Sequence, residues 1–317
     1  MTDTTAQQPN DHQASRPSSL SISGWKDVAV RVLQGIGNDH LSIISAGVAF
    51  FGFLAIFPAI AALIAIYGLI ADPSHVVSSL EAVQPLLPPD VYQMISDQVD
   101  ALVSAGRSAL GVTTLVSILF ALWSARAGVT ALIEGLNIVY NERDDRNIIV
   151  QYLFSLGLTL VVIVMVIVAL LTVVAIPATL RFFEFGVTGR VLAQGAPLLI
   201  MGMAVTLVIG AVYRYGPHRS TARKRWVTYG AVTATFIWLL MSVGLSIYIS
   251  RFANFNQTYG SLGAIVGVLF WFYASAFAVL IGAEINANLE LKTRRDTTTG
   301  PVRPMGERGA YVADNVV

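Results

Sequence analysis

The sequence has few charged residues and no cysteine. Lysine, arginine, aspartate and glutamate make up 12% of its 317 residues, against about 25% in soluble domains. Hydrophobic residues make up 55%, so charged side chains are too few to cover the surface of a soluble domain of this length. The composition excludes a single soluble domain and a disordered chain. The absence of cysteine excludes disulfides, thiolate metal ligands and a cysteine nucleophile.

Histidine and enzyme motifs are also scarce. The four histidines are scattered over tails and loops, and the sequence contains no HExxH motif, no GxSxG motif and no glycine-rich phosphate loop. A net charge of +1 gives no general attraction to nucleic acid. We therefore expect no enzyme, metal site, cofactor or nucleic-acid partner, and an intramembrane enzyme is the least favoured interpretation.

The sequence does contain long stretches without a charged residue. Six of them, each 18 to 34 residues long, lie between Asp39 and Glu284. About 20 helical residues cross the ~30 Å hydrocarbon core of a bilayer. The pattern predicts an all-α, polytopic membrane protein with six transmembrane helices, at residues 41–70, 110–133, 148–176, 194–212, 227–249 and 262–285. Pro58 predicts a kink near the middle of the first helix.

The segments outside the spans have different patterns. Residues 24–37 place their apolar side chains on one face, which predicts an amphipathic helix that either lies in the membrane interface or caps the bundle. Residues 73–107 predict two short amphipathic helices in the first external loop. The polar residues 1–20 and 293–317 predict disordered cytoplasmic tails. Small residues in the first and sixth spans allow close helix packing and permit a homo-oligomer.

Lysine and arginine predict the orientation. With six spans, 15 of the 20 cations lie on the side of both termini, four lie on the other side, and Arg126 lies within the second span. A five-span alternative, in which the segment holding Arg126 does not cross, gives 14 against 6 with the N-terminus outside. The count favours six spans with cytoplasmic N- and C-termini, in the bacterial inner membrane.

Arg126 is the basic residue that this topology does not explain. It lies about 10 Å of helix from the inner end of its predicted span, where a charge costs roughly 2.5–3.5 kcal/mol. One interpretation is an arginine that snorkels or pairs internally and fixes helix packing. The other is a guanidinium that faces a polar cavity and holds a phosphate or carboxylate. Glu284 is a candidate partner, since the second and sixth spans run in the same direction.

Further polar residues cluster at the predicted inner ends of the helices. Candidate functional positions besides Arg126 and Glu284 are Glu134, Asn137, Glu142, Arg143 and Asn286. Residues 134–146 also fit a solvated, salt-bridged turn. The basic loop between the fourth and fifth spans either enforces topology or binds anionic lipid headgroups through Arg219, Arg223, Lys224 and Arg225.

Several motifs together resemble the YihY/BrkB (UPF0761-type) family of bacterial inner-membrane proteins. They are AFFGFLAIFPA at 49–59, LWSARAG at 122–128, YGSLGA at 259–264 and GAEIN at 282–286, with Leu136, Asn137, Tyr140, Glu142 and Arg143 between them. The resemblance covers roughly residues 25–290. It implies six transmembrane helices with both termini cytoplasmic, and it places Arg126, Asn137, Glu284 and Asn286 in family motifs. Members have carried a ribonuclease BN label, which these residues do not support.

Two functions remain open at this point. The first is transport or translocation of a lipid or small anionic solute, with Arg126 holding the negative charge. The second is a non-catalytic membrane scaffold or envelope-integrity factor, in which the same polar groups only fix packing. The expected partners are the lipid bilayer and anionic lipid headgroups, and the sequence names no substrate.

Overall fold

The computed structural model describes residues 16–70, 93, 96, 107–180, 187–251 and 262–317. The long helices there are α1 (Ile22–Asn38), α2 (Leu41–Ile70), α5 (Arg107–Val139), α6 (Ile148–Leu180), α7 (Val187–Tyr215), α8 (Lys224–Arg251) and α10 (Leu262–Glu290). Two short helices, η2 (Pro17–Ser19) and α11 (Tyr311–Asp314), complete them. The external helices predicted within 73–107, and residues 1–15 of the predicted N-terminal tail, lie outside the described residues, except for Gln93, Ser96 and Arg107.

Five of these helices are long and apolar enough to cross a membrane. Their apolar segments are Leu41–Ala59 in α2, Leu115–Val139 in α5, Ile148–Met165 in α6, Lys224–Tyr248 in α8 and Ile265–Glu290 in α10. They correspond to five of the six predicted spans, so the all-α, polytopic membrane fold is confirmed. The remaining predicted span, residues 194–212, falls in α7, whose described apolar stretch, Leu199–Tyr215, is shorter. The structure continues α2 through Pro58 as one helix.

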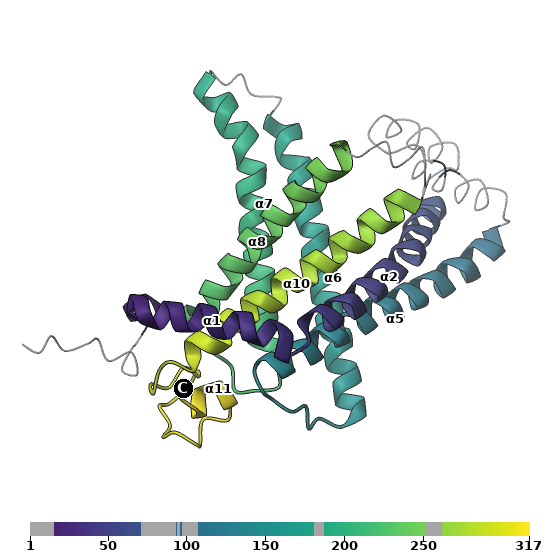
Figure 1. Cartoon of the computed structure of the whole chain (residues 1–317). Coiled ribbons are helices and arrows are strands. Elements are labelled where there is room, and N and C mark those ends of the chain that lie inside the picture. The colour runs from purple at the N-terminus through teal and green to yellow at the C-terminus, as the bar shows by residue number, and fades with distance from the viewer. Residues whose placement is uncertain (1–15, 71–92, 94–95, 97–106, 181–186, 252–261) are drawn as a thin grey trace, which may run out of the picture.

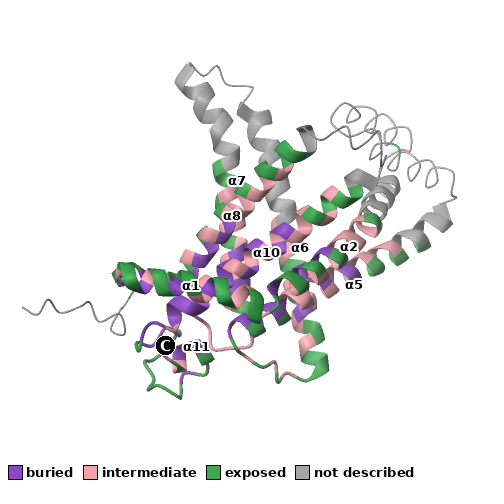
Figure 2. Cartoon of the chain, in the orientation of Figure 1, coloured by how far each residue is buried: buried purple, intermediate pink, exposed green. Residues whose placement is uncertain are grey.

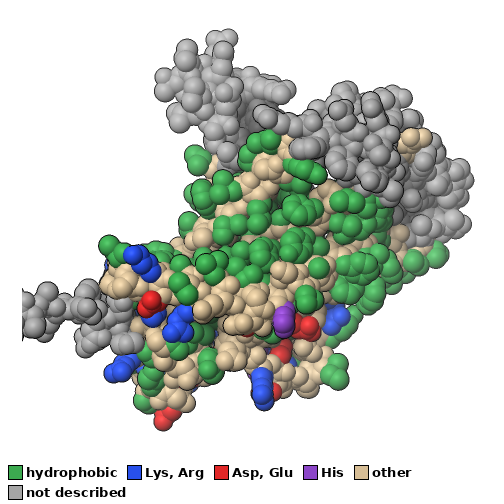
Figure 3. All heavy atoms as spheres, in the orientation of Figure 1, with side chains coloured by type: hydrophobic (Ala, Val, Ile, Leu, Met, Phe, Trp, Pro, Cys, Tyr) green, Lys and Arg blue, Asp and Glu red, His purple; other side chains and the backbone are tan. Residues whose placement is uncertain are grey.

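Each of the six long bundle helices contacts the next, in the closed order α2–α5–α6–α7–α8–α10 and back to α2. Figure 1 shows α2, α5 and α10 inclined together, with α7 and α8 rising beside them. Helix α1 lies across one end of the bundle, next to α11 and the C-terminus. Hydrophobic side chains cover the visible sides of the helices, whereas charged side chains gather at the end near α1 and α11 (Figure 3). We call this end the polar end.

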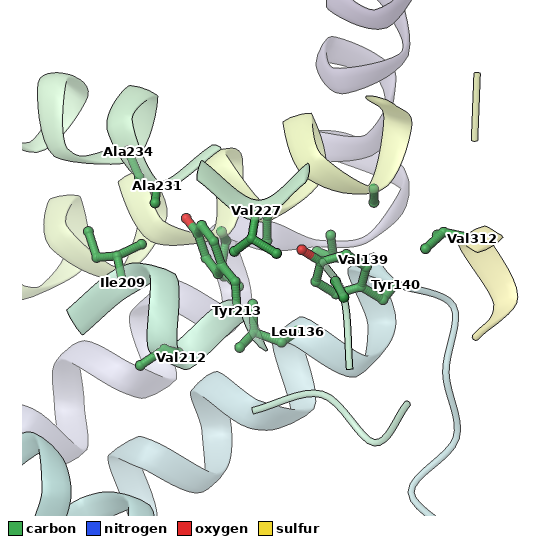
Figure 4. Close-up of a cluster of buried hydrophobic side chains, with 14 of the residues drawn as sticks. Leu136, Val139, Tyr140, Ile209, Val212, Tyr213, Val227, Ala231, Ala234 and Val312 are labelled. Carbon is green, nitrogen blue, oxygen red and sulfur yellow. The ribbon is translucent and has the colours of Figure 1, made fainter. Parts of the chain in front are cut away.

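Burial is concentrated toward the polar end (Figure 2). Leu136 and Tyr140 near the end of α5, Tyr213 near the end of α7 and Leu280 on α10 are fully buried in one apolar cluster. Figure 4 shows Val312 of α11 close to Tyr140 and Val139, so the C-terminal helix closes this cluster. By contrast, the outer faces of the helices expose large apolar side chains, as expected of surfaces that meet lipid. These include Leu115, Trp123, Leu160, Phe236 and Phe270.

Helices α8 and α10 approach so closely that their backbones touch. A Cβ atom at Gly230 would collide with the Gly282 carbonyl oxygen, and one at Gly282 would collide with the Tyr213 hydroxyl. The Asn286 side chain then ties the two helices together: its Oδ1 accepts from Gly230 N at 2.8 Å and its Nδ2 donates to Val227 O at 3.1 Å. Glycine is needed here for space, as in other small-residue crossings of membrane helices.

Helix α1 caps the bundle. Ser21 accepts a hydrogen bond from Gly24 N at its start. Val28 and Val32 pack on Trp226 of α8 and Leu289 of α10. Its opposite face exposes Ile22, Val30 and Leu33, so one apolar stripe faces protein and another remains free. We expected residues 16–20 to belong to a disordered tail. They instead include η2, and Leu20 is buried against α1 and α8.

The prediction of a disordered C-terminal tail is wrong for residues 293–317. The polar side chains of this segment bind its own backbone and the neighbouring loop. Residues 291–317 fold back over the polar end, and we call them the C-terminal cap. Arg308 donates to Arg294 O and Ala313 O at 2.7 and 2.6 Å. Burial alone would raise the pKa of Asp296, but hydrogen bonds from Thr298 and Arg303 outweigh burial and lower it.

The contact between α8 and α10 leads to a prediction. Gly230→Ala adds a methyl group where Gly282 O and Asn286 already lie, so we expect it to destabilise the protein by about 1–3 kcal/mol. Gly244→Ala on the same helix is the matched control, because nothing lies within 4 Å of its added Cβ. Thermal unfolding in detergent measures both. Equal melting temperatures for the two variants would contradict the close contact.

Candidate functional site

Arg126 lies within α5, thirteen residues before its end at Val139, or about 20 Å along the helix. Its guanidinium carbon is 3.8 Å from the centre of the Tyr152 ring, near the start of α6. This distance is typical of a cation–π contact, which is stronger where water is excluded. One face of the guanidinium is thus held by an aromatic ring from the neighbouring helix.

Three buried polar atoms in this part of α5 lack a hydrogen-bond partner in the described residues, and Ser124, two residues from Arg126, lies on another side of the helix. Arg126 Nε, Ser124 Oγ and Thr130 Oγ1 are buried and form no hydrogen bond within the described part of the chain. Arg126 and Thr130 are four residues apart and therefore share a helix face. A buried polar atom without a partner costs about 1–3 kcal/mol. This short segment of α5 thus carries donors for which the described residues supply no acceptor, and we call residues 124–130 the Arg126 segment.

Glu284 is not the partner of Arg126. Its Oε2 accepts from Asn288 Nδ2 at 3.0 Å, and its carboxyl faces Gly35 and Asp39 at the end of α1. The ion pairs found in the described residues include no contact between Arg126 and Glu284. The alternative in which these two residues pair is therefore not the one that the structure adopts.

A buried ion pair joins the elements of the polar end. Arg219 Nη2 lies 2.7 Å from Glu290 Oε1, and the two side chains are 1% and 0% exposed. Thr297 of the C-terminal cap donates to Glu290 Oε2 at 2.7 Å. The Arg219 guanidinium also lies 4.2 Å above the Tyr140 ring. The pair therefore connects the loop after α7, the end of α10, the end of α5 and the cap.

Electrostatics favours the charged form of Arg219 and the neutral form of Tyr140. Burial alone would lower the pKa of Arg219, but Glu290 and Tyr140 outweigh burial and the pKa is raised. Burial also raises the pKa of Tyr140, far above its usual value. Arg219 therefore keeps its charge in this environment. Its two terminal nitrogens donate to Glu290, whereas its Nε has no partner in the described residues.

The predicted lipid-binding loop divides into buried and exposed residues. Arg219 is sequestered by Glu290, so the expectation that it contacts lipid headgroups is wrong for this structure. Arg223 Nε donates to Thr298 O of the cap at 2.7 Å, and its backbone N donates to Thr297 O. Lys224 and Arg225 are exposed at the start of α8, and they are the two cations of the set that remain free for anionic headgroups.

Most of the other candidate residues join elements of the polar end. Asn137 Oδ1 accepts from His218 N at 2.8 Å, and Glu142 Oε1 accepts from Tyr311 N at 2.7 Å. Burial raises the pKa of Glu142, against the effect of that hydrogen bond. The Arg143 carbonyl lies 3.0 Å from His218 Nδ1, while its side chain is exposed.

Glu134 is exposed on α5, and Asn286 clamps α8. These candidates are thus not brought together with Arg126. Sequence reasoning missed Tyr152, Asp39 and Glu290, since no local motif marks an aromatic or acidic residue as the partner of a distant helix.

The comparisons with known proteins agree with this fold. The family model described as Virulence factor BrkB matches residues 32–305. The chain belongs to the BrkB family. It is 29% identical to the putative ribonuclease-like protein YfkH of Bacillus subtilis over 255 residues, covering 79% of this chain and 90% of that protein.

Other BrkB-family relatives are named only as membrane proteins. The UPF0761 membrane protein RC1_0578 of Rhodospirillum centenum is 26% identical over 294 residues, which cover 88% of this chain and 60% of that protein. The UPF0761 membrane protein VSAL_I2938 of Aliivibrio salmonicida is 24% identical over 260 residues, or 81% of each chain. No solved structure matches this chain significantly.

The buried ion pair leads to a second prediction. Glu290→Gln leaves the Arg219 charge buried without a counter-ion, and we expect a loss of about 3–5 kcal/mol in the free energy of unfolding. Asp27→Asn is the matched control, because Asp27 is 63% exposed in its pair with Lys292 and should contribute less than about 1 kcal/mol. Urea unfolding in detergent compares the two. Similar losses would show that burial does not set the strength of these pairs.

Proposed function

We propose that this BrkB-family protein translocates a lipid or a small anionic solute across the membrane, and that Arg126 holds the negative charge of the cargo. The observation that carries this proposal is the Arg126 segment, in which Arg126 Nε and Thr130 Oγ1 share a helix face and lack partners in the described residues. Phosphate and carboxylate groups supply several acceptors each, and arginine binds both strongly. Such a group would satisfy donors that the protein leaves unmet.

The position of Arg126 supports a role in translocation. It lies within an apolar segment of α5 that is long enough to cross the membrane. An intramembrane arginine is costly, and in membrane proteins such residues usually face the bundle interior or a cargo pathway. Tyr152 covers one face of the guanidinium and leaves its Nε unbonded. The stacking contact therefore orients the group without satisfying its hydrogen bonds.

The proposed topology has six spans, including α7, with both termini in the cytoplasm of a bacterium and the bundle in its inner membrane. Two observations support it. The N-terminal and C-terminal elements touch, since Leu20, Trp226 and Leu289 pack together and Asp27 binds Lys292 at 3.2 Å. Contact between the two ends requires an even number of crossings, which favours six over the five-span alternative.

A second candidate function is a non-catalytic scaffold or envelope-integrity factor. It is favoured by the number of predicted functional residues that prove to join elements, namely Asn137, Glu142, Asn286 and Arg219. In this case Arg126 and Tyr152 form only a packing contact, and exposed Lys224 and Arg225 hold anionic lipid. For neither function do we propose an enzymatic activity, and this includes ribonuclease activity. That the protein forms a homo-oligomer stays a prediction.

The topology has a direct test. A reporter active only in the cytoplasm, fused separately before residue 16 and after residue 317, should report the cytoplasm at both positions. The five-span model predicts an external N-terminus and a cytoplasmic C-terminus. A fusion at Lys224 reports the cytoplasm in both models and serves as the internal control. Opposite locations for the two ends would exclude the proposed topology.

Translocation is tested in liposomes that hold the purified protein. We expect it to move a fluorescent anionic phospholipid between leaflets, or a small anion across the bilayer, faster than empty liposomes do. Arg126→Ala should reduce the rate by roughly 10–100-fold, the equivalent of losing a charged hydrogen bond of about 1.5–3 kcal/mol. The lipid and the solute are assayed separately, so the result also identifies the cargo class.

Tyr152→Leu is the matched control for this experiment, since it removes the stacking contact and keeps the guanidinium. If Arg126 acts only in packing, both variants should lose stability together and no cargo should move in the wild type. If Arg126 binds cargo, Tyr152→Leu should keep most of the rate that Arg126→Ala loses. Wild-type rates equal to those of empty liposomes would refute translocation.

A further inference from the structure

Helix α1 carries an exposed apolar face in addition to the face that packs on the bundle. Its inner face holds Val28 and Val32, which are 2% and 7% exposed. The outer face consists of residues spaced three and four apart, namely Ile22, Lys26, Ala29, Val30 and Leu33. Ile22 and Leu33 on this face are 79% and 70% exposed. A helix that only capped the bundle in water would need one apolar face, so packing within the chain leaves the outer face unexplained.

A third face of α1 is polar, and its contacts show which way the helix is turned. It holds Ser23, Asp27, Gln34 and Asn38, all of which are exposed. Asp27 binds Lys292 at 3.2 Å, and Lys292 lies in the C-terminal cap, just beyond the end of α10 at Glu290. The polar face is therefore turned toward the cap.

The edge of the outer face that is remote from the cap lies against a membrane-spanning segment. Trp25 is one turn from both Ile22 and Ala29 and therefore borders the outer face. Its ring contacts the ring of Tyr229 on α8, with 6.0 Å between the centroids. Helix α8 is among those long and apolar enough to cross a membrane. Since the polar face meets the cap and Trp25 meets a span, the outer face is turned toward the membrane.

Helix α8 shows the level of the membrane surface at this contact. Its exposed apolar side chains form one stripe of residues three and four apart, at Val232, Phe236, Leu240 and Val243. Tyr229 comes three residues before this stripe, and exposed Arg225 comes one turn earlier still. Tryptophan and tyrosine are typical of the boundary between the hydrocarbon and the headgroups. The contact between Trp25 and Tyr229 therefore places α1 at that boundary.

The lipid-facing surface also continues beyond the other end of α1. Helix α2 begins at Leu41, and Ile43 and Phe50, seven residues apart on one face, are 72% and 57% exposed. Both lie in the apolar segment Leu41–Ala59. Figure 1 shows α1 lying across the end of the bundle and leading into α2. The outer face of α1 thus borders lipid-facing surfaces of α8 at one end and of α2 at the other.

The charge of the outer face fits an anionic lipid better than a second copy of this chain. Lys26 is the one ionisable residue of that face, and the exposed cations Lys224 and Arg225 begin the neighbouring α8. A lysine on an apolar helix face buries its stem and extends its ammonium group toward phosphate headgroups. Two copies joined symmetrically through this face would instead bring their lysines together without an acidic partner.

We propose that α1 lies in the plane of the membrane, with its outer face inserted among the acyl chains of the adjacent leaflet and Lys26 bound to the headgroup of an anionic phospholipid. Such helices bind through their buried apolar area and through attraction to anionic lipids. Both interpretations of this segment from its sequence then hold, because one face packs on the bundle and another contacts lipid. The lipid contact does not depend on Arg126 or on any cargo, so it applies to a transporter and to a scaffold alike.

Spin labels on α1 test the insertion. The chain has no cysteine, so one introduced cysteine carries the only label on the full-length protein in nanodiscs that contain anionic phospholipid. Leu33 and Gln34 are neighbours on the outer and the polar face. We expect the ratio of collision rates with oxygen, which concentrates in hydrocarbon, and with a water-soluble nickel chelate to be several-fold higher for Leu33→Cys than for Gln34→Cys.

Two further labels calibrate this measurement. Phe236→Cys reports the hydrocarbon beside α8, and Val302→Cys reports water at the C-terminal cap, where Val302 is 77% exposed. A Leu33→Cys label that behaves like Val302→Cys overturns the proposal. A Leu33→Cys label that is shielded from both reagents and shows dipolar broadening also overturns it, because the face would then be covered by a second copy.

Fluorescence quenching tests the choice of lipid. A fluorophore on Leu33→Cys is measured in nanodiscs with equal amounts of a brominated phospholipid that has either an anionic or a zwitterionic headgroup. We expect stronger quenching by the anionic lipid, because Lys26 concentrates it beside the label. Lys26→Gln should reduce this preference about 5-fold, as expected for one cation near a membrane surface. Arg303→Gln is the matched control, since Arg303 is an exposed cation of the C-terminal cap. Equal quenching by the two lipids with Lys26 intact, or an unchanged preference in Lys26→Gln, contradicts the proposal.

Discussion

The hydrocarbon core of a membrane supplies no water, so each polar group inside the bundle needs a partner from the protein. Several buried polar groups of the described residues meet that constraint through other helices. Tyr213 donates to Val279 O at 2.5 Å, and Trp238 Nε1 donates to Ser275 at 3.0 Å. The Asn286 side chain forms hydrogen bonds with two backbone groups of α8. The same contacts hold α7, α8 and α10 together, so the constraint also determines which helices pack.

At the polar end the constraint takes the form of a buried ion pair. The C-terminal cap contacts this pair, and Thr297 of the cap donates to Glu290 Oε2, to which Arg219 Nη1 also donates. A buried pair costs desolvation and becomes stable only when its remaining hydrogen bonds are filled. The cap therefore folds as part of the ion pair's environment, and the pair in turn gives the cap a fixed place on the bundle.

Arg126 and Glu284 are two of the buried polar groups that the described residues leave partly unsatisfied, besides Ser124, Thr130, Tyr140, Asp144, Arg146, Arg214 and Arg219. They lie on different helices and do not contact each other, so they represent two separate requirements. Arg126 lacks an acceptor, which is why an anionic group is proposed there. Glu284 Oε1 lacks a donor and lies against Gly35 in the last turn of α1.

The spans were predictable because hydrophobic length is a property of the local sequence, and five of the six were found in place. The contacts of the polar residues were not predictable, because they join residues that are far apart in the sequence. One interpretation of the sequence had Arg219 bind lipid, whereas in the structure it binds Glu290, 71 positions away. Similarly, residues 293–317 are polar enough to suggest disorder. Their order comes from specific hydrogen bonds with the 216–223 loop and with each other, which composition does not reveal.

In the proposed function, the unpaired donors of the Arg126 segment bind an anionic group. The most direct measurement is an electron cryomicroscopy map of the protein in nanodiscs that contain anionic phospholipid. The account predicts density for a phosphate or carboxylate group within hydrogen-bonding distance of Arg126 Nε, and its loss in Arg126→Ala. A map in which Arg126 and Thr130 are satisfied entirely by protein atoms, with no density beside them, would contradict the claim.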